Sequence, residues 1–192
     1  MATQHTLFDP PAPVLPEGLA FREDFIDAAE EADLLAAIAQ LPFEAARYKA
    51  FTARRRVVSY GHRYDFDENR LEPAQPVAPF LLPLREKAAA WAGVAPEAFA
   101  NALVAQYEPG TPLGWHRDVP DYELVFGVSL AAPARMRLRR YPPVSPKKAD
   151  VISLELPPRS AYVLRGVARW GWQHSIAPTE ALRYSITFRT RR

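Results

Sequence analysis

Residues 183–189 read Arg-Tyr-Ser-Ile-Thr-Phe-Arg, and this heptapeptide decides the expected fold. Side chains of an extended strand point alternately to opposite faces, so Tyr184, Ile186 and Phe188 share one face while both arginines share the other. If the apolar face packs on a core, the polar face lines a cavity or meets water. Two guanidiniums directed into a cavity are costly without anions, and a dicarboxylate ligand would supply them.

Other short strands precede this segment. A period of two in the apolar residues predicts strands at 102–107, 124–130, 135–141, 151–155, 160–164, 171–176 and 182–189. Proline and glycine separate them, as at Pro109-Gly110 and Pro157-Pro158. Seven short strands at this spacing predict a β-sandwich or jelly roll. Three tryptophans are expected to pack in its core: Trp115, Trp170 and Trp172.

Two helices are expected before the strands. Residues 27–41 carry apolar side chains at helical spacing, with Asp27 as the N-cap. Residues 77–92 form the second candidate, which Pro83 is expected to kink. Because both precede the strands, we expect them to pack on the outside of one sheet. The predicted fold is therefore α+β and mainly β.

Length and composition are typical of one globular unit. The chain has 192 residues, of which 48% are apolar and 24% are charged. It has no cysteine, which excludes disulfides, thiolate metal sites and a cysteine nucleophile. No stretch approaches the ~20 apolar residues of a membrane span, and no secretory signal is visible. We therefore expect a monomeric, cytoplasmic protein without membrane contact.

Basic residues cluster in the sequence, although the net charge is only +2. Short basic runs occur at residues 54–56, 135–140 and 147–148, and the pI is about 9.0. Such runs either bind polyanions through phosphate contacts or form solvated faces. Charge alone leaves both interpretations open.

His116 and Asp118 stand two residues apart, so on an extended chain both side chains point the same way. His174 is the candidate for a third ligand, because the other histidines are His5, in the N-terminal tail, and His62. Two histidines and one carboxylate form the facial triad of non-haem iron(II) oxygenases. A surface histidine beside a surface acid is the alternative, and the polar face of the C-terminal heptapeptide favours the metal site over it.

Five segments between residues 101 and 192 resemble, in order and spacing, the AlkB family of nucleic-acid dealkylating oxygenases. They are Ala-Gln-Tyr-Glu-Pro-Gly at 105–110, Gly-Trp-His-Arg-Asp at 114–118, Val-Ser-Leu at 128–130, His-Ser-Ile at 174–176 and the heptapeptide at 183–189. The resemblance implies a double-stranded β-helix (jelly-roll) core with two or more helices packed on one sheet. It also implies Fe(II) as the cofactor, with 2-oxoglutarate and O₂ as cosubstrates.

The resemblance also implies roles for individual residues. The catalytic iron ligands would be His116, Asp118 and His174. The 2-oxoglutarate site would be formed by Tyr107, Arg183, Ser185 and Arg189. Within it, Arg183 would hold the distal carboxylate with help from Tyr107, and Arg189 would lie near the end close to the iron.

Three positions depart from the family pattern. Ala105 and Ser185 stand where the family usually has asparagine, and Pro120 stands where DNA-repair members often carry an acid. The first two departures weaken the polar lining of the cosubstrate site. The third leaves the preferred base open.

Residues 55–66 resemble the nucleotide-recognition lid of the family. Five side chains are candidates for substrate contacts: Arg55, Tyr60, His62, Tyr64 and Phe66. We expect Arg55 to contact a backbone phosphate, and Tyr64 and Phe66 to stack on a flipped base. The alternative is a hairpin that buries its aromatic side chains.

The expected organisation is an extended tail at residues 1–16, followed by one oxygenase domain at 17–192. Residues 17–100 of that domain would hold the helices and the lid, and residues 101–192 the jelly-roll core. In the tail, the sequence from Gln4 to Phe8, Gln-His-Thr-Leu-Phe, resembles the short peptide that docks on the bacterial sliding clamp. It predicts a weak contact with that clamp.

The function implied by the resemblance is oxidative demethylation or dealkylation of N-alkylated bases in DNA or RNA. One alternative is an oxygenase of the same fold that hydroxylates a protein or a small molecule. Another is a non-catalytic binding module with zinc in the same site. A hydrolase is not supported, because no serine motif or cysteine accompanies His116 and Asp118.

Overall fold

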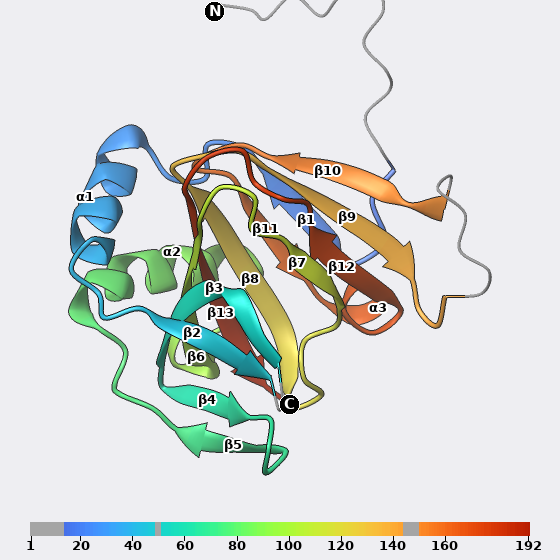
Figure 1. Cartoon of the computed structure of the whole chain (residues 1–192), viewed down its shortest axis with the longest axis horizontal. Coiled ribbons are helices and arrows are strands. Elements are labelled where there is room, and N and C mark those ends of the chain that lie inside the picture. Colours follow the sequence, from blue (N-terminus) through green and yellow to red (C-terminus); the bar gives the residue numbers. More distant parts are fainter. Residues whose placement is uncertain (1–13, 49–50, 144–149) are drawn as a thin grey trace, which may run out of the picture.

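The computed structural model describes residues 14–48, 51–143 and 150–192. Two antiparallel sheets face each other in it, and a third, two-stranded sheet lies at one end (Figure 1). The larger sheet has the order β1-β11-β8-β13-β6-β3-β2. Its strands are β1 (Leu19–Arg22), β2 (Glu44–Tyr48), β3 (Phe51–Tyr60), β6 (Phe99–Tyr107), β8 (Tyr122–Leu130), β11 (Ala161–Leu164) and β13 (Arg183–Arg191).

The smaller sheet has the order β10-β9-β12-β7 and faces the inner side of the larger one. Its strands are β7 (Leu113–His116), β9 (Ala134–Arg140), β10 (Ile152–Leu156) and β12 (Trp172–Ile176). The third sheet is a hairpin of β4 (His62–Asp65) and β5 (Arg70–Pro73). The seven predicted strands thus all form, and the architecture is the predicted jelly roll, mainly β with few helices.

Strand β13, which carries the heptapeptide, lies between β6 and β8 in the larger sheet. Ile186 and Phe188 are fully buried on the face beneath the helices, together with Phe126 of β8. Arg183 and Ser185 point to the opposite face, between the two sheets. The alternation that the sequence predicted therefore separates an apolar core from a polar interior.

Helices α1 (Ala28–Ile38) and α2 (Leu82–Ala92) cover the outer face of the larger sheet (Figure 1). Asp27 caps α1 as predicted: its side chain accepts a hydrogen bond from the Glu30 N–H, and Glu30 accepts one from the Asp27 N–H. The described residues contain no helix long and apolar enough to cross a membrane.

The predicted kink at Pro83 is wrong. A short 3-10 helix (Pro79–Leu81) precedes α2, which begins only at Leu82. Pro83 therefore lies in the first turn of α2, where no hydrogen bond requires its missing N–H. Two further short helices, a 3-10 turn (Pro96–Ala98) and α3 (Gly166–Trp170), were not predicted.

A second apolar cluster fills one end of the space between the sheets, with Met136, Leu138 and Leu156 at its centre. Trp172 belongs to it, as expected. Trp115 and Trp170 do not: both are half-buried, and arginine side chains lie over their rings. The expectation that all three tryptophans pack in the core is therefore wrong for two of them.

Candidate active site

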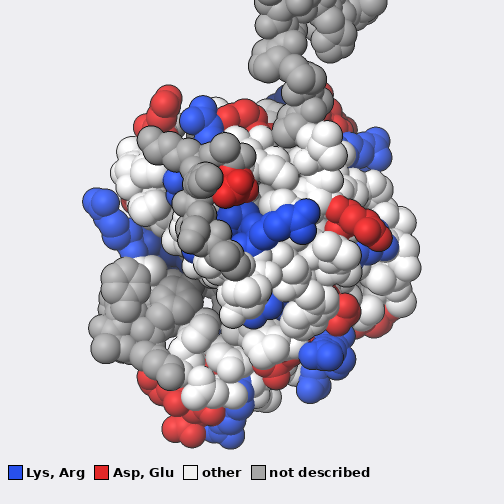
Figure 2. Space-filling model, turned by 90° about the vertical axis from the view of Figure 1, so that its right-hand side faces the viewer, with Lys and Arg blue, Asp and Glu red and all other residues white. Residues whose placement is uncertain are grey.

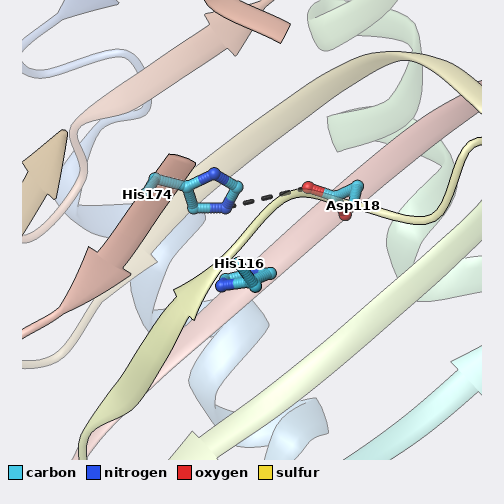
Figure 3. A group of neighbouring side chains, drawn as sticks. All are labelled: His116, Asp118 and His174. Atoms are coloured by element: carbon cyan, nitrogen blue, oxygen red, sulfur yellow. Dashed lines mark ion pairs between the residues drawn. The ribbon is translucent and has the colours of Figure 1, made fainter. Parts of the chain in front are cut away.

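Three potential metal ligands meet in the space between the two sheets (Figure 3). His116 is the last residue of β7, Asp118 lies in the loop that follows, and His174 lies on β12, where it is paired with His116. Their ligand atoms all lie within 4.8 Å of one another, and the two imidazole centroids are 4.2 Å apart. Among the described residues, no other group of three His, Asp or Glu side chains is placed to hold a metal ion.

Both histidines are in the neutral imidazole form that binds a metal. His116 Nδ1 lies 2.9 Å from the carbonyl oxygen of Gly114, which can only accept, so Nδ1 carries the proton and Nε2 is left to bind a metal. Burial lowers the pKa of His116. Burial and the neighbouring His116 lower the pKa of His174 to about 3. Both rings are therefore uncharged at neutral pH, the form that metal binding needs.

Asp118 is buried and ionised. Burial raises the pKa of its carboxyl, but Arg189 and the two histidines outweigh burial and hold this pKa well below its usual range. Arg189 donates from Nε to Asp118 Oδ1 at 2.6 Å, and Oδ2 of the same carboxylate lies 3.7 Å from His174 Nε2. The Nη1 of Arg189 also donates to Asn101 Oδ1 and Thr187 Oγ1, each at 2.9 Å.

Arg169 of α3 fixes the loop that carries Asp118. Its Nη2 donates to three backbone carbonyls, those of Asp118 (3.1 Å), Val119 (2.8 Å) and Tyr122 (2.8 Å). The side chain is only 2% exposed, so these bonds form in a medium where they are strong. The carboxylate of Asp118 is thus held by Arg189, and its backbone by Arg169.

Arg183 lies on the same face of β13 as Arg189, between the two sheets, and is 2% exposed. Its Nε donates to Ser129 Oγ at 3.0 Å, and its guanidinium lies 5.0 Å from the ring centroid of Tyr107. Within the described part of the chain, its Nη1 is buried and has no hydrogen-bond partner. A buried guanidinium with a donor that no described residue uses is chemically suited to an anionic partner.

Arg55 of β3 reaches Tyr107, the neighbour of Arg183. Its Nη1 lies 3.4 Å from Tyr107 Oη, so Tyr107 has one guanidinium at its hydroxyl and that of Arg183 over its ring. Burial raises the pKa of Tyr107, but Arg55 and Arg183 together outweigh burial and lower it. Arg55 therefore points toward Tyr107, between the two sheets, whereas the sequence-based prediction for it is a contact with a nucleic-acid phosphate.

Two of the three departures from the family pattern lie side by side. Ser185 of β13 pairs with Ala105 of β6, and both side chains are buried between the sheets. Each is smaller than the asparagine expected from the family pattern, and the Ser185 side chain lies beside Tyr107. The Arg55 guanidinium extends toward the same tyrosine.

The substrate-lid candidates fall into two groups. Tyr64 and Phe66, on the β4–β5 hairpin and its turn, are half-buried and contact each other edge-on with centroids 4.9 Å apart. His62 anchors this hairpin, because its Nδ1 bonds the Ala100 carbonyl at 2.9 Å. Tyr60 does not belong to the lid: it is 4% exposed in the core beneath the helices. Its role as a substrate contact is therefore corrected, because β3 turns this side chain toward the helices and away from the space between the sheets.

Sequence reasoning missed three residues that support the site: Asn101, Ser129 and Arg169. The register that places Asn101 beside Arg189 and Ser129 beside Ser185 joins distant strands and is visible only in the structure. Arg169 gave no signal, because its short helix was not predicted. The sequence from Gln4 to Phe8, with its proposed clamp contact, lies outside the described residues.

The family description of the 2OG-Fe(II) oxygenase superfamily matches residues 19–189. The chain belongs to this superfamily. Its enzymes use Fe(II) and 2-oxoglutarate with O₂, and the cluster of His116, Asp118 and His174 suits that metal. The cofactor prediction is confirmed at this level.

Relatives of this oxygenase confirm the AlkB-like resemblance. The "Alkylated DNA repair protein ALKBH8 homolog" of Arabidopsis thaliana is 31% identical over 181 residues, which are 83% of this chain and 50% of that protein. The chain therefore spans about half the length of this curated relative.

Solved structures show the same fold. The structure of OsALKBH1 matches with a TM-score of 0.72 and 16% identity, over 94% of this chain and all of that one. A prolyl-4-hydroxylase from Pseudomonas putida matches with a TM-score of 0.59 and 16% identity, over 91% and 93% of the two chains. At this identity the likeness concerns the fold alone.

Proposed function

We propose that this oxygenase removes alkyl groups from nitrogen atoms of nucleobases in DNA or RNA. One observation carries the oxidative part: the buried Arg183, with its unused Nη1, lies in the same interior as the three metal ligands. The substrate part is supported by the Arabidopsis relative, whose name describes repair of alkylated DNA. An aromatic pair on a hairpin beside the larger sheet adds a candidate surface for a base.

The residues present fit Fe(II). His116, His174 and Asp118 offer two neutral nitrogens and one carboxylate oxygen, which leave half of an octahedral shell open for a cosubstrate and O₂. When bound, iron with 2-oxoglutarate and O₂ supplies the oxidising power that hydroxylates an N-alkyl carbon, with succinate and CO₂ as coproducts. The hydroxylated product is a hemiaminal, which loses an aldehyde and returns the unmodified base.

The side chains of this protein position the reactants. Arg189 keeps the Asp118 carboxylate ionised and fixed, and the Gly114 carbonyl fixes the tautomer of His116. Arg183 would receive the distal carboxylate of 2-oxoglutarate in a fork-to-carboxylate pair. Burial of these groups excludes water, which strengthens each charge interaction.

We further propose that Arg55 belongs to the cosubstrate pocket. Its contact with Tyr107 Oη places a second cation beside Arg183, where a dicarboxylate would bring the compensating charge. Arg55 would thereby offset the hydrogen bonds lost through Ala105 and Ser185. In this assignment, the phosphate contacts of the nucleic acid come from other residues.

The test is mass spectrometry of methylated single-stranded DNA, RNA and a methylated peptide after incubation with Fe(II), ascorbate, 2-oxoglutarate and the protein. Loss of methyl groups from a nucleic acid, with stoichiometric succinate, is the expected result. The His116→Ala variant should yield no succinate, whereas Arg63→Gln, which changes an exposed residue of β4, should match the wild type. Peptide hydroxylation with untouched nucleic acid would contradict the proposal.

A further inference from the structure

The outer face of the smaller sheet carries a row of arginines that the active site does not use. On β9, Met136 and Leu138 point inward to the second core, so Arg137 and Arg139 point outward. We call this surface the arginine face, and it consists of Trp115, Arg117, Arg137, Arg139 and Tyr141. Figure 2 looks onto the side of the molecule where β9 and β10 lie, and Lys and Arg side chains gather near the centre of that view.

Neutral groups hold all three arginines in place. Arg137 donates from Nε to Ser175 Oγ at 3.1 Å, and Arg139 donates from Nε to Gln173 Oε1 at 2.9 Å. The Nη1 of Arg117 donates to a backbone carbonyl, that of Trp170, at 3.0 Å. Among the residues that the structure describes, no carboxylate forms an ion pair with any of the three. Their positive charge is therefore held in place without a carboxylate partner from the described part of the chain.

Aromatic rings fix the same guanidiniums from a second direction. Arg139 lies 4.4 Å and Arg137 5.3 Å from the ring centroid of Trp115. Arg117 lies 3.7 Å from the ring centroid of Tyr141, which is 41% exposed. Such stacking favours the cation and orders its long side chain before any ligand arrives. An incoming anion therefore loses less affinity to the ordering of side chains.

Arg135 shows that this arrangement is not general for the strand. It lies on the same face of β9, two residues before Arg137, but pairs with Glu155 of β10 at 2.5 Å. Its charge is neutralised by that acid, and both side chains are well exposed. On this face of β9, Arg135 has an acidic partner and the arginines of the arginine face have none among the described residues. This difference distinguishes the arginine face from an ordinary solvated basic strand.

We propose that the arginine face binds the phosphate backbone of a nucleic acid and so forms a second contact surface for the substrate. This inference rests on the proposed function, which names nucleic acid as the substrate class. Arginine forks match phosphate oxygens, and phosphate contacts supply most sequence-independent affinity. The location is suitable, because β7 is the edge strand of the smaller sheet and ends in His116. Arg117 stands between His116 and Asp118 in the chain, so a strand of nucleic acid bound on this face would run close to the metal ligands.

The experiment measures fluorescence anisotropy of labelled, unalkylated single-stranded RNA and DNA with the full chain, as a function of salt. The double variant Arg137→Gln/Arg139→Gln should bind more weakly, and its log–log salt slope should shrink by about 0.7 for each arginine removed. The matched control is Arg135→Gln, on the same strand and face, which should bind like the wild type. No turnover is needed, so the result does not depend on whether the proposed dealkylation occurs.

Three outcomes would overturn the proposal: an unchanged affinity and slope in the double variant, an equal loss in Arg135→Gln, or displacement of the oligonucleotide by polyglutamate of equal charge. The last would mark a general polyanion surface. A measurement on the wild type guards against misfolded variants. Photocrosslinking to bromouracil-containing RNA or DNA should label the peptides that contain Trp115 and Tyr141, and labelling confined to other peptides contradicts the proposal.

Discussion

Arg189 and Asp118 form a buried ion pair in which the guanidinium Nε donates to carboxylate Oδ1 across 2.6 Å. The pair joins β13, the C-terminal strand, to the loop that follows β7, so it connects two distant parts of the sequence. Arg189 is held in turn by Asn101, whose amide donates to the backbone carbonyl of His62 at the start of the lid hairpin. The metal site and the lid therefore share one chain of hydrogen bonds.

Replacement of Arg189 should weaken metal binding. In Arg189→Ala the buried Asp118 loses its main cationic partner and its fixed orientation, and we expect Mn(II) affinity to fall by about 10- to 100-fold. Titration calorimetry of the metal-free protein measures this directly. The control is Arg191→Ala, an exposed residue of the same strand, which should leave the affinity unchanged. Equal affinities in wild type and Arg189→Ala would show that the pair does not support the ligand.

Removal of the Arg183 guanidinium should abolish tight binding of 2-oxoglutarate while metal affinity stays the same. Arg183→Met keeps the apolar length of the side chain but loses the charged hydrogen bonds, each of which is worth roughly 1.5–3 kcal/mol. We expect the dissociation constant of 2-oxoglutarate to rise at least about tenfold, measured anaerobically on the Mn(II) protein. Ser129→Ala removes only the hydroxyl that orients Arg183 and should have a smaller effect.

Arg55 distinguishes a cosubstrate contact from a phosphate contact. Because its Nη1 lies 3.4 Å from Tyr107 Oη, Arg55→Ala should raise the dissociation constant of 2-oxoglutarate by about tenfold. The affinity for unalkylated oligonucleotide should not change. The neighbouring Arg54, which is exposed, provides the control variant Arg54→Ala. If Arg55→Ala instead weakens oligonucleotide binding and leaves 2-oxoglutarate binding unchanged, Arg55 contacts a nucleic-acid phosphate and not the cosubstrate.

Strand alternation made much of the fold predictable. The heptapeptide at 183–189 separated core from interior correctly, because a strand in the middle of a sheet must satisfy both faces. The capping residue of α1 was equally local, since Asp27 and Glu30 are three residues apart. The cluster of metal ligands followed from residue types, because the chain has few histidines and one His-x-Asp.

Features that depend on pairing between distant segments were not predictable. Tyr60 was placed in the lid because nothing local shows that β3 pairs with β6 and turns this side chain toward the helices. Strand β7 was missed because its four residues, Leu-Gly-Trp-His, lack a period of two. Alternation put Arg189 on the polar face, but it could not show that Asp118 accepts its hydrogen bond.

The stability of the metal-free protein should fall in mild acid. Burial and His116 lower the pKa of His174 from 6.5 to about 3. At a pH between these two values, His174 is protonated in the unfolded chain and neutral in the folded chain. Stability is therefore lost as the pH falls below 6.5, by about 2 kcal/mol at pH 5 from this residue alone. Chemical denaturation at several pH values measures the slope.

The variant His174→Gln should flatten this dependence without abolishing it. Burial also lowers the pKa of His116, so a second histidine contributes in the same direction. Asp118 adds a further loss at still lower pH, because its pKa is held below the usual range and protonation removes the pair with Arg189. A slope identical to that of the wild type in His174→Gln would show that His174 is not buried as a neutral ring.

The aromatic pair on the β4–β5 hairpin decides between a recognition lid and a merely structural hairpin. Phe66→Leu keeps apolar volume but removes the ring, so a stacking role predicts that KM for a methylated oligonucleotide rises by about 10- to 100-fold, since stacking on one base is worth ~1–3 kcal/mol. Phe66→Tyr, which restores a ring, should recover it. Affinity for 2-oxoglutarate should stay constant in both variants. If Phe66→Leu instead lowers the melting temperature with an unchanged KM, the ring packs against Tyr64 to stabilise the hairpin and the base is recognised elsewhere.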